Sequence, residues 1–444
     1  MSDWIRHAVW WQVYPLGATA AEREALPPDA GPVPRLKELH GWLPHLVSLG
    51  CNGLALGPVF ESGTHGYDTV DHFRVDRRLG TEDDLRELLD ACHAAGIRVL
   101  LDGVFNHVGR DFPRFREVLE QGPGAPSAPW FDIDPAGSGP DGFSYRDFEG
   151  HSALVALDHG NPEVAEHVAR VMNHWCDLGV DAWRLDAAYA VPPAFWRAVL
   201  PRVREAHPDV WIVGEVLHGD YAGYVAESGI DSVTQYELWK AVWSSLNDRN
   251  LFELAHALGR HGEMVASFLP QTFVGNHDVT RLASRLDDAR HLPLALALLF
   301  ALPGVPTVYY GDEFGLRGVK EDRAGGDDAV RPALPTSQDP PGEEAARLAD
   351  LHRLLIGVRR RHPWLAGATV EAPDELRNEL LAVRLTGEGH TLAVVLNVGE
   401  HPAEVSLPLG GGSVLAGDAD TWPEAGGTRV RVPGHAYALV GDGG

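Results

Sequence analysis

The sequence predicts an α/β protein built on a (β/α)8 TIM barrel, with a short excursion after strand 3 and a C-terminal β-sandwich. Short apolar runs alternate with amphipathic segments over most of the 444 residues, and strands without helices follow residue 365. Regular alternation of strand and helix is typical of a parallel sheet with right-handed crossovers. A hydrophobic content of 44% is sufficient for a core of this size.

Eight candidate strands support the barrel. They begin near residues 8, 52, 96, 179, 210, 232, 271 and 306, in short runs rich in β-branched and aromatic residues. Helical segments separate them. In TEDDLRELLDACHAAG, we expect Thr81 and Asp84 to cap the helix and Gly96 to end it. Eight repeats favour a closed barrel over an open doubly wound sheet. No GxGxxG motif follows the first strand, which disfavours a dinucleotide-binding fold.

The predicted domains are a catalytic barrel at 1–364 and an all-β domain at 365–444. The barrel includes a small excursion at about 106–152, because this interval is too long for an ordinary loop and is rich in Gly, Pro and aromatic residues. We expect the excursion to lie beside the mouth of the barrel. A second loop rich in Gly and Asp, 317–333, follows the eighth strand.

Charge and composition restrict the partners and the compartment. The net charge of −26 disfavours nucleic acid and anionic membranes, which are bound through clustered Lys and Arg, whereas a small neutral substrate is compatible. The first residues lack the pattern of a secretory signal, and no long apolar run is present. Cys51, Cys92 and Cys176 are expected to be buried thiols in a reducing compartment. We therefore expect a cytoplasmic protein; the sequence does not predict its oligomeric state.

Polar residues at the carboxyl ends of the predicted strands are the candidates for chemistry, because TIM-barrel active sites form there. Three carboxylates, Asp186, Glu215 and Asp278, follow three different strands and are expected to converge on one pocket. The other polar residues at these ends are Asp102, Asn106, His107, Arg184 and His277.

A pair of carboxyl groups is what glycoside hydrolysis with retention of configuration requires. One is an ionised nucleophile and the other an acid that protonates the leaving oxygen, about 5 to 5.5 Å away. Asp186 and Glu215 are the candidates. Arg184 is two residues before Asp186, on the same face of the strand, and is expected to keep it ionised. Glu215 is in the apolar segment VGEV, where desolvation is expected to raise its pKa.

The chain resembles the α-amylase family, glycoside hydrolase family 13, over most of its length. The resemblance rests on DGVFNH at 102–107, GVDAWRLDA at 179–187, GEV at 214–216 and FVGNHD at 273–278, in the order and spacing of the family. It implies that Asp186 is the nucleophile, Glu215 the general acid/base and Asp278 the third carboxylate, which holds sugar hydroxyls. It also implies that His107 and His277 donate to the sugar before the scissile bond, and that Arg184 and Asp102 shape the surroundings of the nucleophile.

The segment THGYDTVDHF at 64–73 is similar to the family's loop after strand 2. By this resemblance Tyr67 stacks on the same sugar and Asp68 binds its hydroxyls. The flanking sequence looks closest to the intracellular neopullulanase, cyclodextrinase and α-glucosidase branches. The implied substrates are short α-glucans or α-linked oligosaccharides.

The chain departs from the family pattern at two places. The position of a calcium-binding aspartate falls on Ala156, so the amylase-type calcium site looks incomplete and no cofactor or metal is expected. Calcium held by oxygen ligands elsewhere remains open. After the nucleophile, Tyr189 and Ala190 replace a basic residue and a histidine that are common in the family, which disfavours internal cleavage of long starch chains.

Alternatives of other kinds remain at this stage. The same intermediate serves transglycosylases and isomerases that form trehalose or isomaltulose, because only the attacking hydroxyl differs. An inactive carbohydrate-binding protein is disfavoured by the retention of Asp186, Glu215 and Asp278. A metal-dependent hydrolase is disfavoured because no His-x-His pair follows the first strand.

Overall fold

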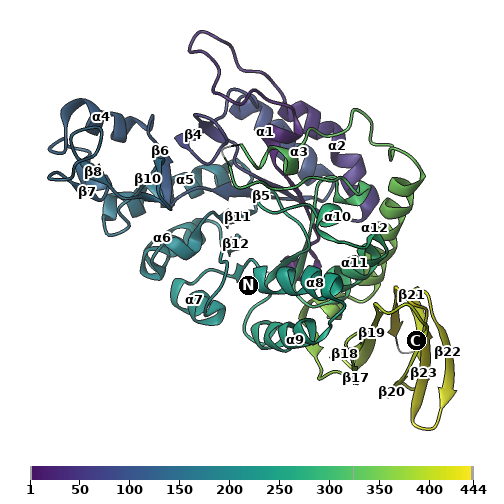
Figure 1. Ribbon diagram of the computed structural model, residues 1–444. Coiled ribbons are helices and arrows are strands. Elements are labelled where there is room, and N and C mark those ends of the chain that lie inside the picture. Colours follow the sequence, from purple (N-terminus) through teal and green to yellow (C-terminus); the bar gives the residue numbers. More distant parts are fainter. Residues whose placement is uncertain (1–2, 324, 442–444) are drawn as a thin grey trace.

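The computed structural model describes residues 3–323 and 325–441. All eight strands predicted for the barrel are present and form one sheet of parallel strands (Figure 1). In barrel order they are β1 (Trp10–Val13), β2 (Gly53–Leu56), β5 (Arg98–Gly103), β11 (Ala182–Leu185), β12 (Trp211–Gly214), β13 (Ser232–Val233), β14 (Gln271–Phe273) and β15 (Val305–Tyr309). β15 pairs with β1, and a parallel bridge between Thr234 and Gln271 joins the two remaining edges. The predicted fold class is therefore confirmed.

The interior of the barrel changes from apolar to charged along the strands. Because side chains alternate between the two faces of a strand, Leu100 and Asp102 of β5 point inward, as do Ala182 and Arg184 of β11. Leu100 and Ala182 belong to an apolar cluster that includes the stacked Trp10 and Trp211 rings. The register pairs Arg184 with Asp102. The charged residues therefore lie at the carboxyl ends of the strands, next to this packed apolar cluster in the barrel interior.

Helices surround the barrel, and many of them begin with the expected signals. The cap predicted at Thr81 is confirmed, since its side chain and that of Asp84 exchange hydrogen bonds with the backbone. None of the described helices is long and apolar enough to span a bilayer. The helices outside the excursion are α1 (Pro15–Ala18), α2 (Leu36–Leu49), α3 (Glu82–Ala94), α5 (Pro162–Leu178), α6 (Pro193–Ala206), α7 (Tyr221–Ser228), α8 (Tyr236–Asp248), α9 (Phe252–Val265), α10 (Leu282–Arg285), α11 (Leu292–Ala301) and α12 (Glu343–Arg361).

Short 3-10 helices join several of these elements. They are Asp3–His7, Ala128–Trp130, Ala188–Ala190, Ala289–His291, Asp312–Phe314, Asp328–Val330 and Pro363–Gly367. The one at Ala188–Ala190 directly follows the predicted nucleophile, and Asp328–Val330 lies in the loop after β15.

An excursion after β5 projects from one side of the barrel (Figure 1). It contains α4 (Pro113–Gln121), the pair β7 (Ile133–Asp134) and β8 (Ser144–Tyr145), and a sheet in the order β6 (His107–Gly109), β10 (His151–Ala156) and β9 (Asp147–Phe148). A hairpin of β3 (Phe60–Ser62) and β4 (Thr69–Val75) lies after β2 and carries the loop with Tyr67. These additions bring His107, Phe148 and Tyr67 to the mouth of the barrel.

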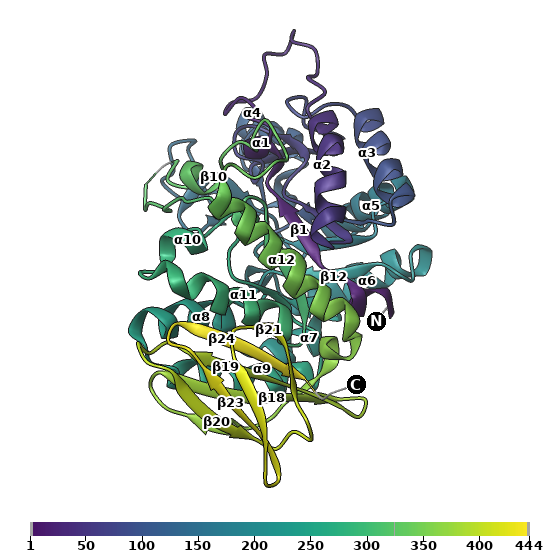
Figure 2. The same ribbon diagram turned by 90° about the vertical axis from the view of Figure 1, so that its right-hand side faces the viewer.

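The C-terminal region consists of two packed sheets. The larger contains β16 (Thr369–Val370), β17 (Glu375–Leu376), β18 (Leu380–Gly387), β19 (His390–Asn397), β24 (Ala436–Gly441) and β21 (Ser413–Gly417), and the smaller contains β20 (Ala403–Leu407), β23 (Gly427–Val432) and β22 (Asp420–Glu424). Along β19, Val394 belongs to the core shared with the barrel, whereas Ala393 and Val395 face the smaller sheet. The larger sheet therefore joins the region to the barrel helices (Figure 2). The domain boundaries remain predictions, and residues 1–2 and 442–444 lie outside the described residues.

Candidate active site

A pocket of about 300 Å³ opens at the carboxyl ends of the barrel strands. Five residues predicted from the sequence line it: Tyr67, His107, Asp186, Glu215 and Asp278. Asp102, Arg184 and His277 lie behind this lining and contact it, as described below. Further lining residues not predicted as site residues are Phe148, Glu149, Leu154, Tyr189, Leu217, Tyr236, Val279 and Lys320.

Arg184 is at the centre of the charged groups. Its Nη1 donates to both oxygens of Asp102 at 2.7 and 2.8 Å and to Oδ1 of Asp186 at 3.1 Å. Its Nη2 lies 2.8 Å from Oε1 of Glu215 and 4.0 Å from Oδ2 of Asp278. One guanidinium group thus brings together four carboxyl groups from the ends of four strands. Such an ion is suited to fixing their orientation because its donors form a rigid fork.

Burial modifies the expectation for the predicted nucleophile. Asp186 is 7% exposed, and burial raises its pKa well above the ordinary aspartate value. Arg184 opposes this increase, whereas the charges of Glu215, Asp102 and Asp278 add to it. The sequence predicts that Arg184 keeps Asp186 ionised. Arg184 does lower the pKa of Asp186, but desolvation and three neighbouring carboxylates raise it, so the ionisation of Asp186 stays a prediction.

Glu215 is held by the backbone after the nucleophile and by a tyrosine. Ala187 has a left-handed conformation with a φ of 46°, which turns the chain sharply after Asp186. Its N–H donates to Oε2 of Glu215 at 2.9 Å. The Tyr236 hydroxyl donates to Oε1 at 3.2 Å and itself accepts from Asn276 at 2.9 Å. Burial and the charge of Glu215 raise the pKa of Tyr236, so this hydroxyl retains its proton and remains a donor.

Asp278 is kept ionised by neighbouring cationic groups and a histidine. Its Oδ1 accepts from Nη2 of Arg331 at 2.8 Å, and its Oδ2 lies 2.9 Å from Nε2 of His277. Burial alone would raise the pKa of Asp278, but His277, Arg331 and Arg184 together hold the pKa well below its usual range. An anion fixed in this way is suited to accepting hydrogen bonds from sugar hydroxyls.

A layer of aromatic rings fixes His277 beneath the pocket. The Tyr67 ring is nearly parallel to the His277 ring, with centroids 5.7 Å apart, and the Tyr14 ring stacks at 6.2 Å. The Gln12 amide lies 3.2 Å from Nδ1 of His277 and is expected to donate to it. The Nε2–H of His277 then faces the Tyr67 hydroxyl and Asp278.

Two predicted substrate contacts have other partners in this structure. His107 Nε2 bonds to the Tyr67 carbonyl at 3.0 Å, and Asn106 Nδ2 bonds to Nδ1 at 3.1 Å. Burial lowers the pKa of His107 to about 3, so its ring is neutral near pH 7. Asp68 lies outside the pocket lining and accepts from the Thr64 backbone and hydroxyl at 3.1 and 2.9 Å. Contacts of His107 and Asp68 with sugar therefore remain predictions.

The far wall of the pocket comes from two separate segments. Tyr189, three residues after Asp186, donates to Oε1 of Glu149 at 2.7 Å. Glu149 has a φ of 53° and follows Phe148, whose ring stacks on His107 with centroids 4.7 Å apart. Lys320, from the loop after β15, also lines this wall and pairs with Asp327 at 3.2 Å.

One of the two positions of the amylase-type calcium site offers no side-chain oxygen. Ala156 is buried and offers no side-chain oxygen. The Asn106 side-chain nitrogen is directed at His107, and its backbone carbonyl accepts from the Leu157 N–H at 3.1 Å. Calcium prefers six to eight oxygen ligands, and these two positions do not supply the usual ones.

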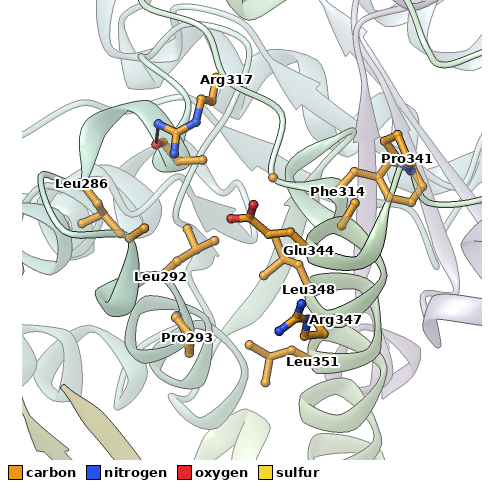
Figure 3. A pocket seen from close by; sticks show the side chains of 14 residues that line it. Leu286, Leu292, Pro293, Phe314, Arg317, Pro341, Glu344, Arg347, Leu348 and Leu351 are labelled. Carbon is orange, nitrogen blue, oxygen red and sulfur yellow. Dashed lines mark hydrogen bonds between the residues drawn. The ribbon is translucent and has the colours of Figure 1, made fainter. Parts of the chain in front are cut away.

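A second cavity, of about 350 Å³, lies between α12 and the segment from α10 to α11 (Figure 3). Leu286, Leu292, Leu348 and Leu351 give it an aliphatic lining, while Arg317, Glu344 and Arg347 add charged groups. Its lining contains none of the three predicted catalytic carboxylates. The three predicted catalytic carboxylates therefore lie in the pocket at the carboxyl ends of the strands and not in this cavity.

Comparison with known proteins agrees with this site. Residues 35–347 match the family described as "Alpha amylase, catalytic domain". The chain is 30% identical to a maltogenic alpha-amylase from Bacillus acidopullulyticus, over 91% of this chain and 72% of that protein. It is 32% identical to a cyclomaltodextrinase from a Bacillus species, over 89% and 73%.

A solved structure extends the likeness to the whole chain. The ligand-free cyclic alpha-maltosyl-(1→6)-maltose hydrolase from Arthrobacter globiformis superposes with a TM-score of 0.83 at 28% identity, covering 99% of this chain and 100% of that chain. The match extends through both the barrel and the C-terminal β-rich region. The chain therefore belongs to the α-amylase family and is a glycoside hydrolase.

Proposed function

We propose that this enzyme hydrolyses α-glucosidic bonds in short α-glucans or oligosaccharides through a covalent glycosyl-Asp186 intermediate. The observation that carries the proposal is the position of Arg184, which contacts Asp186 at 3.1 Å and Glu215 at 2.8 Å. The two carboxyl groups therefore face one pocket from neighbouring strand ends. A paired nucleophile and acid is what hydrolysis with retention needs.

Each step uses groups of this pocket. The Asp186 carboxylate attacks the anomeric carbon while Glu215 gives its proton to the leaving oxygen, which breaks the glycosidic bond. Glu215, now ionised, takes a proton from water as the water oxygen attacks the same carbon. This second attack releases Asp186 and the sugar product. Asp278 accepts hydrogen bonds from the sugar hydroxyls in both steps, and we propose no metal or cofactor at this centre.

The substrate class follows from the size and wall of the pocket. About 300 Å³ is at the lower end of the range for small-molecule sites, which favours short substrates. Tyr189 and Glu149 close the side near the leaving group. The names of the relatives, which refer to cyclomaltodextrin, maltose and a cyclic maltosyl-maltose, agree with compact α-glucans.

We also propose a cytoplasmic location. Cys51, Cys92 and Cys176 are all buried free thiols, as expected from the sequence. Burial raises the pKa of Cys92 to about 12, so this thiol is protonated and unreactive. Such cysteines are typical of proteins in reducing compartments.

A second candidate activity is transglycosylation on the same intermediate. It is favoured by Tyr189 and Glu149, because this hydrogen-bonded pair lies where an acceptor sugar would enter. The two activities differ only in whether water or a sugar hydroxyl attacks the anomeric carbon.

The test is turnover of a panel of α-glucosides: maltose, maltotriose, isomaltose, sucrose, a cyclodextrin and starch. Wild type is compared with Asp186→Asn and Glu215→Gln, and NMR follows the anomer released first. We expect turnover of short members, with the α-anomer appearing first, and its loss in Asp186→Asn. Initial release of the β-anomer, or full activity of Asp186→Asn, would refute the proposal. Adding excess glucose as acceptor separates hydrolysis from transfer by the products formed.

A further inference from the structure

Three metal-ligating side chains meet where the barrel contacts the C-terminal sheets. Asp288 and His291 come from the segment that leads into α11, and His435 comes from the turn between β23 and β24. One ligand atom of each lies within 4.8 Å of the others. Nε2 of His291 is 3.0 Å from Nδ1 of His435, which is 3.8 Å from Oδ2 of Asp288. α11 and β24 are in contact at this junction (Figure 2).

We propose that Asp288, His291 and His435 bind a divalent metal ion of the zinc class, which ties the C-terminal region to the barrel. Two imidazole nitrogens and a carboxylate oxygen suit zinc, with water as a fourth ligand. Two nitrogens at about 2.0 to 2.1 Å from a tetrahedral zinc ion are about 3.3 Å apart. The ring nitrogens, 3.0 Å apart, require only a small movement, whereas Oδ2 of Asp288, 3.8 Å from Nδ1 of His435, must move closer to complete the set.

The rings of His291 and His435 are both buried at this junction. His291 is 1% exposed, and its Nδ1 has no hydrogen-bond partner in the described structure. The His435 side chain is 5% exposed. The backbone of His435 is left-handed, with a φ of 55°, a conformation that few residues other than glycine adopt. The His435 ring stacks on the His291 ring, with centroids 5.2 Å apart.

The carboxylate of Glu400 lies beside His435, where it can contact the ring nitrogen that does not face His291. Oε2 of Glu400 lies 2.9 Å from Nε2 of His435, on the side of the ring opposite His291. The pair is close in distance but lacks hydrogen-bond geometry. In carboxylate–histidine–zinc arrangements a carboxylate holds the proton of one ring nitrogen, which leaves the other nitrogen to coordinate. Glu400 is half exposed and lines a cleft of about 650 Å³.

Two arginines set the charge of the junction. Arg290 binds both oxygens of Asp288, with Nη2 2.7 Å from Oδ2, and Arg249 lies 2.9 Å from Glu400. A carboxylate oxygen has more than one lone pair, so Asp288 can bind Arg290 and a metal together. The competing arrangement is a purely protein network in which one imidazole donates to the other. The experiment below separates the two.

The probe is ZnCl2 alone, added to wild-type protein after dialysis against EDTA. We expect one tightly bound ion per chain by calorimetry, a higher Tm that EDTA reverses, and with Co²⁺ the visible absorption of a four-coordinate site. Asparagine tolerates the left-handed backbone, so His435→Asn should fold and lose these three effects. His291→Gln should also lose them, whereas the control His256→Asn, at an exposed position on α9, should retain them.

The absence of stoichiometric binding by wild type would overturn the proposal and leave the hydrogen-bonded network. Binding that survives in both His435→Asn and His291→Gln would also overturn it, because the ion would then lie elsewhere. Circular dichroism confirms the folding of each variant. The binding readouts do not require turnover, so their outcome is independent of the proposed catalytic mechanism. Activity on maltotriose at saturating substrate is expected in all of the variants.

Discussion

The hydroxyl of Tyr189 donates a 2.7 Å hydrogen bond to Glu149 and joins the segment after the nucleophile to the excursion after β5. Both residues line the pocket. Tyr189 follows Asp186 by only three residues, so the bond lies beside the proposed nucleophile. This wall of the pocket is therefore assembled from two segments 40 residues apart.

Glu149→Gln is expected to raise KM for maltotriose by roughly three- to tenfold, because a charge-assisted contact to a leaving-side sugar is lost. An aryl α-glucoside carries no such sugar, so its KM should change little. Tyr189→Phe, which removes the hydroxyl that orients Glu149, should change KM in the same direction. Equal changes for both substrates would show that the pair does not act on the leaving side.

Tyr236→Phe is expected to lower kcat for maltose by about tenfold. The hydroxyl bond to Glu215, at 3.2 Å, orients the proposed acid, and loss of such a bond costs about 1 to 1.5 kcal/mol. With α-glucosyl fluoride, whose leaving group needs less protonation, the loss should be smaller. Tyr437→Phe, in the C-terminal region, is the control with unchanged kcat. A loss of the same size for both substrates would argue against a role through Glu215.

The pH dependence should reflect the raised pKa of Asp186. The nucleophile must be ionised, so the acid limb of kcat/KM should lie above the ordinary aspartate pKa of about 3.9. Asp102→Asn removes a negative charge that raises the pKa of Asp186. Its acid limb should therefore move to lower pH. Glu205→Gln, at an exposed position on α6, is the control. An upward shift in Asp102→Asn would contradict this electrostatic account.

Thr81→Ala is expected to lower the free energy of unfolding by about 1 kcal/mol, because it removes the cap of α3. Denaturant titration measures the change, and kcat should stay constant since α3 is outside the pocket. Thr369→Ala, at an exposed position on β16, serves as a comparison at a position that caps no helix. An unchanged midpoint for Thr81→Ala would show that the cap contributes nothing measurable.

Much of the fold could be predicted because local signals and the global topology agree. Each barrel strand is a short apolar run, and the cap at Thr81 needs only residues within one helical turn. The three carboxylates could be found for the same reason, since Asp186 and Glu215 directly follow β11 and β12 and Asp278 comes five residues after β14. Their convergence then results from the parallel arrangement of the strand ends.

The parts of the site that could not be predicted depend on contacts between distant segments. Arg331 reaches Asp278 from a loop 53 residues away, and no periodic pattern marks it. Glu149 lies in the excursion, whose placement over the pocket depends on the pairing of β9 with β10. The direction of the pKa shift of Asp186 could not be predicted, because it depends on how far the packed structure buries the carboxyl group and on how close the neighbouring charges lie.

The most direct test of the proposed mechanism is to trap the intermediate with 5-fluoro-α-glucosyl fluoride and to analyse the digested protein by mass spectrometry. Fluorine slows both chemical steps, and the reactive leaving group favours accumulation of the covalent species. The account predicts one added 5-fluoroglucosyl group per chain, on the peptide containing Asp186, and none in Asp186→Asn. A label on another residue, or turnover by the wild type with initial release of the inverted product, would contradict it.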